Sequence, residues 1–249
     1  MLKVGLTGAI ASGKSVVGEM FVALGAHLVQ ADRIAHSLMQ PGEPVYNEVV
    51  RHFGRDILNP DGSVNRAKLA ELAFGANPTN PAAARSGSVR TSSARTSSAR
   101  TNPARSGADR SGAPTSPPAR VEELNRIVHP AVLRSQVEWM EEMGRQDPHA
   151  IAIVEAALIL EAGAAKQFDR LIVVKCSEAQ RVARFAARHK LDLEAARKEV
   201  TRRMAAQLPE AEKIKAADFV IDNSGSLDGT RERVRELWER LRTEAAMKI

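Results

Sequence analysis

The sequence predicts an α/β fold built on a parallel β-sheet, in one domain that spans all 249 residues. A short apolar run is followed by a glycine-rich turn and then by an amphipathic helical pattern, which is typical of a strand–loop–helix unit. Further apolar runs recur along the chain with helical patterns between them, and this alternation favours a parallel sheet. The expected strands are residues 2–6, 26–31, 150–154, 171–175 and 219–221.

The glycine-rich turn has the spacing of a phosphate-binding loop, which specifies the fold class further as that of a P-loop NTPase. Gly8 is followed after four residues by Gly13, Lys14 and Ser15, in the pattern G-x-x-x-x-G-K-S/T. Backbone N–H groups of such a loop, together with the N-terminus of the next helix, surround phosphate oxygens. We expect Lys14 to reach the β- and γ-phosphates of ATP and the Ser15 hydroxyl to ligate Mg²⁺. The predicted nucleotide-binding residues of the loop are Gly8, Ala9, Ile10, Ala11, Ser12, Gly13, Lys14 and Ser15.

Composition indicates a water-soluble protein with an aliphatic core, because 43% of the residues are hydrophobic and only 4% are aromatic. The single cysteine, Cys176, excludes an intrachain disulfide and fits a reducing, cytoplasmic setting. We expect this thiol to be buried at a strand end. The longest apolar run, residues 150–165, contains Glu155 and Glu161, so no membrane span is expected.

The stretch from residue 76 to residue 119 differs in kind from the rest of the chain. Arginine recurs there every five residues, and the only large apolar side chain is that of Val89. Such a composition buries too little apolar surface to offset the entropy of folding, so we expect a disordered insertion between ordered segments 1–75 and 120–249. Its six arginines and one aspartate account for +5 of the net charge of +6. Nucleic-acid binding is therefore not expected of the folded part, and an RNA-binding role of this stretch is a competing hypothesis.

Asp32 directly follows the second expected strand. The carboxyl ends of parallel strands line the ligand crevice, which places Asp32 near the phosphate loop. Asp is also a favoured N-cap residue, and Asp32 precedes a helical pattern over residues 33–39. Both roles are open to the same side chain.

Helical patterns without intervening strands follow over 45–53 and 66–74, which indicates a helical excursion from the sheet. Helical patterns also flank the His129–Pro130 pair, and we expect one helix to end and the next to begin there, because proline disfavours helix at the preceding residue. His129 is either a ligand-site residue or a structural histidine.

Arginines are concentrated in two expected helices, 178–189 and 192–207. Arg184 and Arg188 lie four residues apart and so share one helix face. Such a pair could clamp phosphate groups, or could be a solvated face paired with glutamates. A C-terminal amphipathic helix is expected through Leu241.

The remaining motifs favour a small-molecule kinase among phosphate-loop proteins. The Asn-Lys-x-Asp signature of GTPases is absent from the sequence, as is a strand that ends in the Asp-Glu pair of motor ATPases. A kinase needs the loop, Mg²⁺, a carboxylate near the acceptor hydroxyl and lid arginines. The residues 8–15, Asp32 and the arginine-bearing helices supply these groups.

Seven segments together resemble the dephospho-coenzyme A kinase family. They are GLTGAIASGKS (5–15), ADRIAH (31–36), NPDGSVNRAKLAELAFG (59–75), LNRIVHP (124–130), LILE (158–161), RRMAAQLP (202–209) and ADFVIDNSG (217–225). The resemblance implies a nucleoside-monophosphate-kinase-like core with a helical substrate region and a helical lid. It also implies transfer of a phosphoryl group from ATP to the ribose 3′-hydroxyl of dephospho-coenzyme A, the last step of coenzyme A biosynthesis.

The resemblance also implies roles for particular residues. Asp32 becomes the general base, while His129 and Glu161 fall in segments that line the acceptor side. Asn223 falls where a loop approaches the adenine. The candidates for lid residues at the phosphates are Arg184, Arg188 and Arg203.

Two positions depart from the family pattern. Gln30 stands where the family has the first aspartate of Asp-Ala-Asp, and Ala157 stands where a proline is common. The arginine-rich insertion is not a family feature. Another small-molecule kinase, of the nucleoside monophosphate or shikimate type, is the alternative, and the sequence leaves the oligomeric state open.

Overall fold

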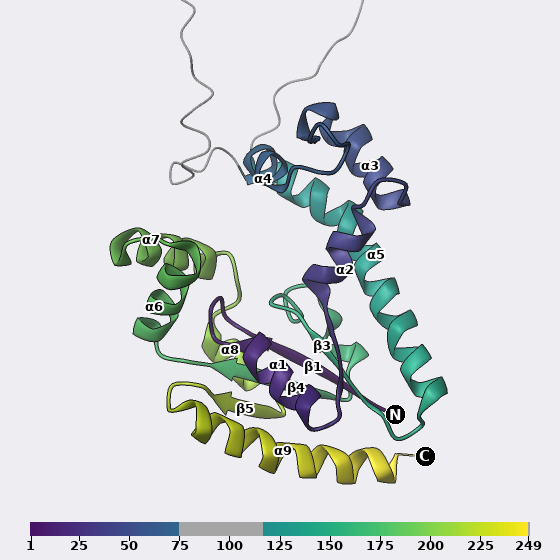
Figure 1. The fold of residues 1–249 in the computed structure, drawn as a ribbon, viewed down its shortest axis with the longest axis vertical. Helices are drawn as coiled ribbons and strands as arrows, with labels where there is room; N and C mark the ends of the chain where they lie inside the picture. Colours follow the sequence, from purple (N-terminus) through teal and green to yellow (C-terminus); the bar gives the residue numbers. More distant parts are fainter. Residues whose placement is uncertain (75–116, 249) are drawn as a thin grey trace, which may run out of the picture.

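The computed structural model describes residues 1–74 and 117–248, which form a five-stranded sheet with helices on both faces (Figure 1). The strands are β1 (Leu2–Gly8), β2 (His27–Gln30), β3 (Ile151–Glu155), β4 (Arg170–Lys175) and β5 (Phe219–Asp222). Their order is β2-β3-β1-β4-β5, and every neighbouring pair is parallel. The predicted α/β class, the parallel sheet and its five strands are therefore confirmed.

The helices of the described residues fall into a sheet-covering set, a helical region and a lid. They are α1 (Lys14–Ala23), α2 (Ala31–Leu38), α3 (Pro44–Phe53), α4 (Arg66–Phe74), α5 (Pro117–Gln146), α6 (Glu178–His189), α7 (Leu193–Ala205), α8 (Glu210–Lys215) and α9 (Leu227–Met247), with short 3₁₀ turns η1 (Arg55–Ile57) and η3 (Ala164–Gln167).

One face of the sheet is covered by α1 and α9. The central strand β1 is buried along almost its whole length, and its apolar side chains pack with Phe21 of α1 and Trp238 of α9. Near-continuous burial explains why β1 is mostly apolar, and its one charged residue, Lys3, is also its one residue that is not fully buried. On the other face, the C-terminal part of α5 packs Met140 against β3.

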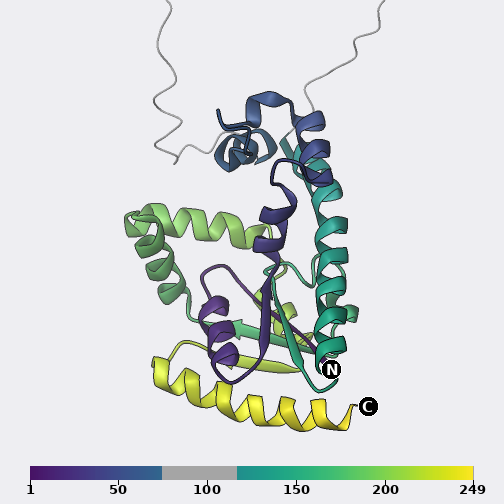
Figure 2. The ribbon, with the colours of Figure 1, turned by 45° about the vertical axis from the view of Figure 1, so that its right-hand side comes forward.

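The helical excursion forms a region of its own above the sheet, built from α2, α3, α4 and the N-terminal part of α5 (Figures 1 and 2). Its core contains Val49, Phe53 and Ile57, together with Val128 and Val132 of α5. The long helix α5 thus connects this region to the sheet. The lid, formed by α6 and α7, stands apart from α3 and α4 of the helical region in Figure 1.

The structure corrects the predicted break at His129–Pro130. Residues 117–146 form one helix, and Pro130 lies inside it. An internal proline removes one backbone hydrogen bond and costs about 3 kcal/mol. Burial of Val128, Ala131 and Val132 around this point favours the continuous helix.

Two other expectations change at helix starts. The N-cap residue of α2 is Gln30, and Asp32 lies within the first helical turn, so Asp32 is not the cap. Its carboxylate is still favourable there, because the N-terminus of a helix carries partial positive charge. Most of the predicted disordered insertion, 76–119, lies outside the described residues, and its last three residues, 117–119, belong to α5. The short helix α8 was not predicted.

Candidate active site

The site is organised by the loop between β1 and α1, at the carboxyl end of the central strand. Gly8 begins the loop with φ +152°, and a Cβ there would lie 2.2 Å from the Val174 carbonyl oxygen of β4. Gly13 ends it with φ +97°, and a Cβ there would lie 2.1 Å from the Asn223 amide nitrogen. Glycine is required at both positions because the neighbouring chain leaves no room for a side chain.

Lys14 lies at the centre of this site. Its ammonium donates to the carbonyl oxygens of Gly8 and Ala9, both at 3.1 Å. Burial lowers the pKa of Lys14 from 10.5 to about 8, although the nearby carboxylates of Glu155 and Asp32 act in the opposite direction. Arg188 also acts electrostatically on Lys14 and lowers its pKa further. Asp32 and Arg188 thus both lie within electrostatic range of Lys14.

Glu155 is a site residue that the sequence analysis did not identify. It ends β3 and is 8% exposed. Its Oε1 accepts the Ser15 hydroxyl at 2.8 Å, and its Oε2 accepts the Gln30 side-chain amide at 2.9 Å. Gln30 and Glu155 are paired in register on β2 and β3. A carboxylate at the end of a buried strand was the available signal, because parallel strands end at the same edge of the sheet.

Gln30 therefore contacts Glu155 at the position where the resembled family has its first aspartate. An amide can donate to a carboxylate, whereas a second carboxylate would repel it. Gln30 thus supplies a hydrogen-bond donor to the carboxylate that also contacts Ser15.

Asn223 anchors the phosphate loop from the end of β5. Its side chain is 5% exposed; Nδ2 donates to the Ser12 carbonyl at 2.9 Å, and Oδ1 accepts the Thr230 hydroxyl at 3.1 Å. Arg184 reaches the same place from the lid and donates to the carbonyl oxygens of Ser12 and Asn223 at 3.2 and 3.0 Å. Both polar atoms of the Asn223 amide are thus bonded within the protein.

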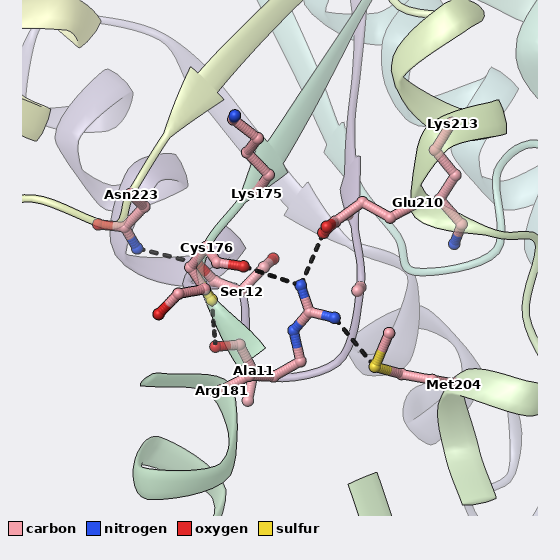
Figure 3. A network of polar contacts seen from close by, with 12 residues as sticks. Ala11, Ser12, Lys175, Cys176, Arg181, Met204, Glu210, Lys213 and Asn223 are labelled. Atoms are coloured by element: carbon pink, nitrogen blue, oxygen red, sulfur yellow. Dashed lines mark hydrogen bonds and ion pairs between the residues drawn. The ribbon is translucent and has the colours of Figure 1, made fainter. Parts of the chain in front are cut away.

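A buried guanidinium joins the base of the lid to the sheet. Arg181 of α6 is 2% exposed and donates to the Cys176 carbonyl at 3.0 Å and to Glu210 of α8 at 2.7 Å (Figure 3). Its other terminal nitrogen lies 2.9 Å from the Met204 sulfur, at the end of α7. Both ends of the lid therefore meet at one side chain. Cys176 is buried directly after β4, as predicted.

Arg203 lies on the lid, away from the loop contacts described above. Its Nε donates to Glu199 Oε1 at 2.6 Å, and its guanidinium stacks over the Phe185 ring at 5.3 Å. The guanidinium groups of Arg202 and Arg203 lower the pKa of Glu199 to about 2. These contacts hold α7 against α6 within the lid.

His129 and Glu161 line one cavity of about 500 Å³, between α5 and the turn that follows β3. Asn125 and Arg126 of α5 line the same cavity, as does Ala206 directly after α7. Burial lowers the pKa of His129 below its usual 6.5. The imidazole is then neutral near pH 7 and can both donate and accept hydrogen bonds. The volume is in the range of small-molecule sites.

Two further features bear on metals and membranes. Within residues 1–74 and 117–248, three or more His, Cys, Asp or Glu side chains do not gather in a form that could hold a metal by themselves. In the same residues, no helix has the length and apolar character that crossing a membrane requires.

Comparison with known proteins identifies the family. The sequence model of the dephospho-CoA kinase family matches residues 2–83 and 115–229. The interruption falls within the arginine-rich stretch, while all the predicted site residues lie in the matched segments.

Individual relatives agree with this match along nearly the whole chain. The dephospho-CoA kinase of Syntrophotalea carbinolica is 36% identical over 97% of this chain and 92% of its own length. That of Leifsonia xyli is 34% identical over 97% of this chain and its full length. The structure of dephospho-CoA kinase from Campylobacter jejuni shares the fold, with a TM-score of 0.60, 21% identity and coverage of 97% of both chains. The chain therefore belongs to the dephospho-CoA kinase family of P-loop kinases.

Proposed function

We propose that the enzyme transfers the γ-phosphoryl group of ATP to the ribose 3′-hydroxyl of dephospho-coenzyme A, and that the residues around Lys14 perform the transfer. Dephospho-CoA kinase activity follows from the family membership. The observation that carries the assignment of roles is the electrostatic environment of Lys14, which includes Glu155, Asp32 and Arg188 from three different elements. Positive and negative groups at one point suit a reaction that moves a phosphoryl group and a proton.

The loop from Gly8 to Ser15 would bind the triphosphate. Lys14 now donates to two loop carbonyls, and phosphate oxygens would be stronger acceptors for its ammonium. Arg184 contacts this loop from the lid helix α6, and Arg188 of the same helix acts electrostatically on Lys14. Both would neutralise charge on the transferring group. We assign Asn223 to holding the loop rather than to direct adenine recognition, because both of its side-chain polar atoms are already bonded. Arg203 remains a candidate for a nucleotide contact when the lid closes.

The donor set beside the loop fits Mg²⁺. Ser15 and Glu155 present a hydroxyl and a carboxylate in contact with one another, and Mg²⁺ prefers oxygen ligands. Few protein ligands are needed, because Mg²⁺ in kinases keeps several waters and phosphate oxygens in its shell. When bound, the ion would neutralise charge on the β- and γ-phosphates.

Asp32 would act as general base toward the acceptor hydroxyl. It is exposed at the first turn of α2, within electrostatic range of Lys14. The carboxylate would take the hydroxyl proton as the oxygen bonds to the γ-phosphorus, and the bond from that phosphorus to the bridging oxygen of ADP would break. The cavity with His129 and Glu161 would hold other parts of the acceptor. Because burial lowers the pKa of His129, its neutral imidazole favours recognition of a neutral group there.

A coupled assay of ADP release tests this proposal. The acceptors offered separately would be dephospho-coenzyme A, AMP, CMP and shikimate, each with ATP and Mg²⁺. We expect rapid turnover with dephospho-coenzyme A only. Preferential turnover of a nucleoside monophosphate or shikimate would contradict the assigned acceptor.

A cytoplasmic location fits these substrates and the lone, reduced thiol of Cys176.

A further inference from the structure

Lys213, in the short helix α8, is a buried cation that the roles above do not use. Its side chain is 1% exposed. The ammonium lies 2.7 Å from Glu161 Oε1, 3.0 Å from the Ala157 carbonyl oxygen and 3.4 Å from the side-chain oxygen of Gln207. A lysine ammonium has three N–H donors, and three acceptors surround this one. No donor is left for a ligand, so Lys213 does not itself bind phosphate.

The contacts of Lys213 connect two parts of the site. Ala157 lies in the turn after β3, and its carbonyl oxygen also accepts the hydroxyl of Thr7, on β1, at 3.3 Å. The Thr7 hydroxyl and the Lys213 ammonium thus hold the turn at Ala157, where a proline is common in the resembled family. Gln207 lies two residues beyond the end of the lid helix α7. One ammonium therefore joins the turn after β3 to the segment through which the chain leaves the lid.

Glu161 makes the same connection from the other side. Its Oε1 accepts both the Lys213 ammonium and the backbone N–H of Leu208, the latter at 2.9 Å. Its Oε2 is buried and has no partner within the described residues, although Glu161 lines the cavity of about 500 Å³. A buried carboxylate oxygen without a partner is costly, and such groups often await a ligand. Ala206, at the lid exit, lines the same cavity.

We propose that Lys213 is a positioning residue for the acceptor substrate. It holds the Glu161 carboxylate in place, so that Oε2 accepts an N–H or O–H group of the acceptor in this cavity, and it ties that carboxylate to the exit of the lid. The proposal rests on the assignment of this cavity to the acceptor.

The test compares steady-state kinetics of Lys213→Met and Glu161→Gln with a matched control, Lys215→Met. Lys215 lies on the same helix, but its side chain is 73% exposed and pairs with Glu212. We expect both Lys213→Met and Glu161→Gln to raise the KM for dephospho-coenzyme A about tenfold or more, the cost of one charge-assisted hydrogen bond, with the KM for ATP nearly unchanged. Lys215→Met should match the wild type.

The double variant Lys213→Met/Glu161→Gln distinguishes positioning from two independent contributions. If Lys213 acts through Glu161, the double variant should raise the acceptor KM no more than the worse single variant. It should also unfold at a higher temperature than Lys213→Met, because no unpaired buried charge remains.

The proposal would be overturned if the effects of Lys213→Met and Glu161→Gln on the KM for dephospho-coenzyme A were additive in the double variant. Equal changes in the KM for dephospho-coenzyme A and the KM for ATP would also overturn it. Should Lys213→Met fail to fold, Glu161→Gln decides alone, since its amide oxygen can still accept the Leu208 N–H; an unchanged acceptor KM would then reject it. Failure of the assigned function is recognised separately, as absence of dephospho-coenzyme A turnover by the wild type.

Discussion

At the scale of single residues, the site depends on opposite charges that lie close together around the buried ammonium of Lys14. Lys14 is surrounded by protein atoms yet lies near two carboxylates, those of Glu155 and Asp32, and two cations, those of Lys213 and Arg188. Burial disfavours its charged form more than the carboxylates favour it. The protonation of Lys14 in the free enzyme therefore responds to pH in the range where enzymes are assayed.

The pKa of Lys14, lowered to about 8, predicts a pH-dependent loss of ATP capture. The ammonium is lost as pH rises through 8 in the free enzyme, so kcat/KM for ATP should fall above that pH. Bound phosphates favour the charged form, and the corresponding fall in kcat should occur at higher pH. Profiles of both parameters measure this difference. If kcat and kcat/KM for ATP fell at the same pH, Lys14 would not control the binding of ATP.

Asp32→Asn should lower kcat about 100-fold or more, because the amide cannot accept the hydroxyl proton. The KM for ATP should change little, since Asp32 lies outside the phosphate loop. Asp228→Asn is the matched control, because Asp228 also lies in the first turn of a helix but at 90% exposure on α9. Turnover of Asp32→Asn at the level of this control would reject Asp32 as the base.

At the scale of elements, the phosphate loop is held by segments from distant parts of the chain. The Ser12 carbonyl accepts from Asn223, at the end of β5, and from Arg184, on α6. Asn223 is fixed in turn by Thr230 of α9. The loop conformation is therefore a property of β1, α6 and α9 together.

Gly13→Ala should weaken ATP binding strongly, because the new Cβ would lie 2.1 Å from the Asn223 amide. Gly25→Ala is the control. Gly25 also has positive φ, +112°, but a Cβ there meets only Trp238, at 3.7 Å. The control should lose stability without a change in the KM for ATP, since backbone strain is common to both sites. Equal effects of the two substitutions on the KM for ATP would contradict the role of the Asn223 contact.

Helix α5 shows how tertiary packing overrides a local signal. Pro130→Ala should raise the free energy of unfolding by about 1 kcal/mol or more, because alanine restores the N–H that a helix interior uses. Pro44→Ala is the control, since Pro44 lies at the start of α3, where proline is favoured. Denaturant midpoints measure both. A loss of stability in Pro130→Ala similar to that of the control would contradict this account.

At the scale of the whole molecule, the site lies where three separately packed regions meet. The sheet, the helical region and the lid each have their own apolar cluster. The lid cluster also includes Ile10 and Ala11 of the phosphate loop. Such an arrangement allows the lid to move against the sheet while each region stays packed.

Deletion of residues 84–114 should leave the kinase intact, because the family model matches the chain on either side and all the site residues lie in the matched segments. The deletion removes six arginines and one aspartate and lowers the net charge from +6 to +1. We expect kcat/KM for both substrates to stay within about twofold, since loop length has a small entropic cost.

Binding of RNA at two salt concentrations tests the competing role of the arginines. Salt-sensitive binding by the full chain that disappears in the deletion would support it. Binding that survives the deletion would exclude the insertion as its cause.

The sequence alone determined the strands and the phosphate loop, and it made Asp32 a candidate residue near that loop. These features rest on local patterns: an apolar run of strand length, a fixed glycine spacing, and residues directly after strand ends. The family resemblance assigned His129 and Glu161 to the acceptor side, and the structure places both in one cavity.

Only the tertiary structure decided which distant groups meet. Ser15 contacts Glu155 across 140 positions of the chain, and Asn223 contacts Ser12 across 211. Such pairs depend on the order of strands in the sheet, which the local pattern of any one strand does not encode. Pro130 stays within a helix because apolar burial around it outweighs its local preference. Lys213 is buried because Glu161 and two further acceptors, distant or absent in any local pattern, offset the cost of burying its charge.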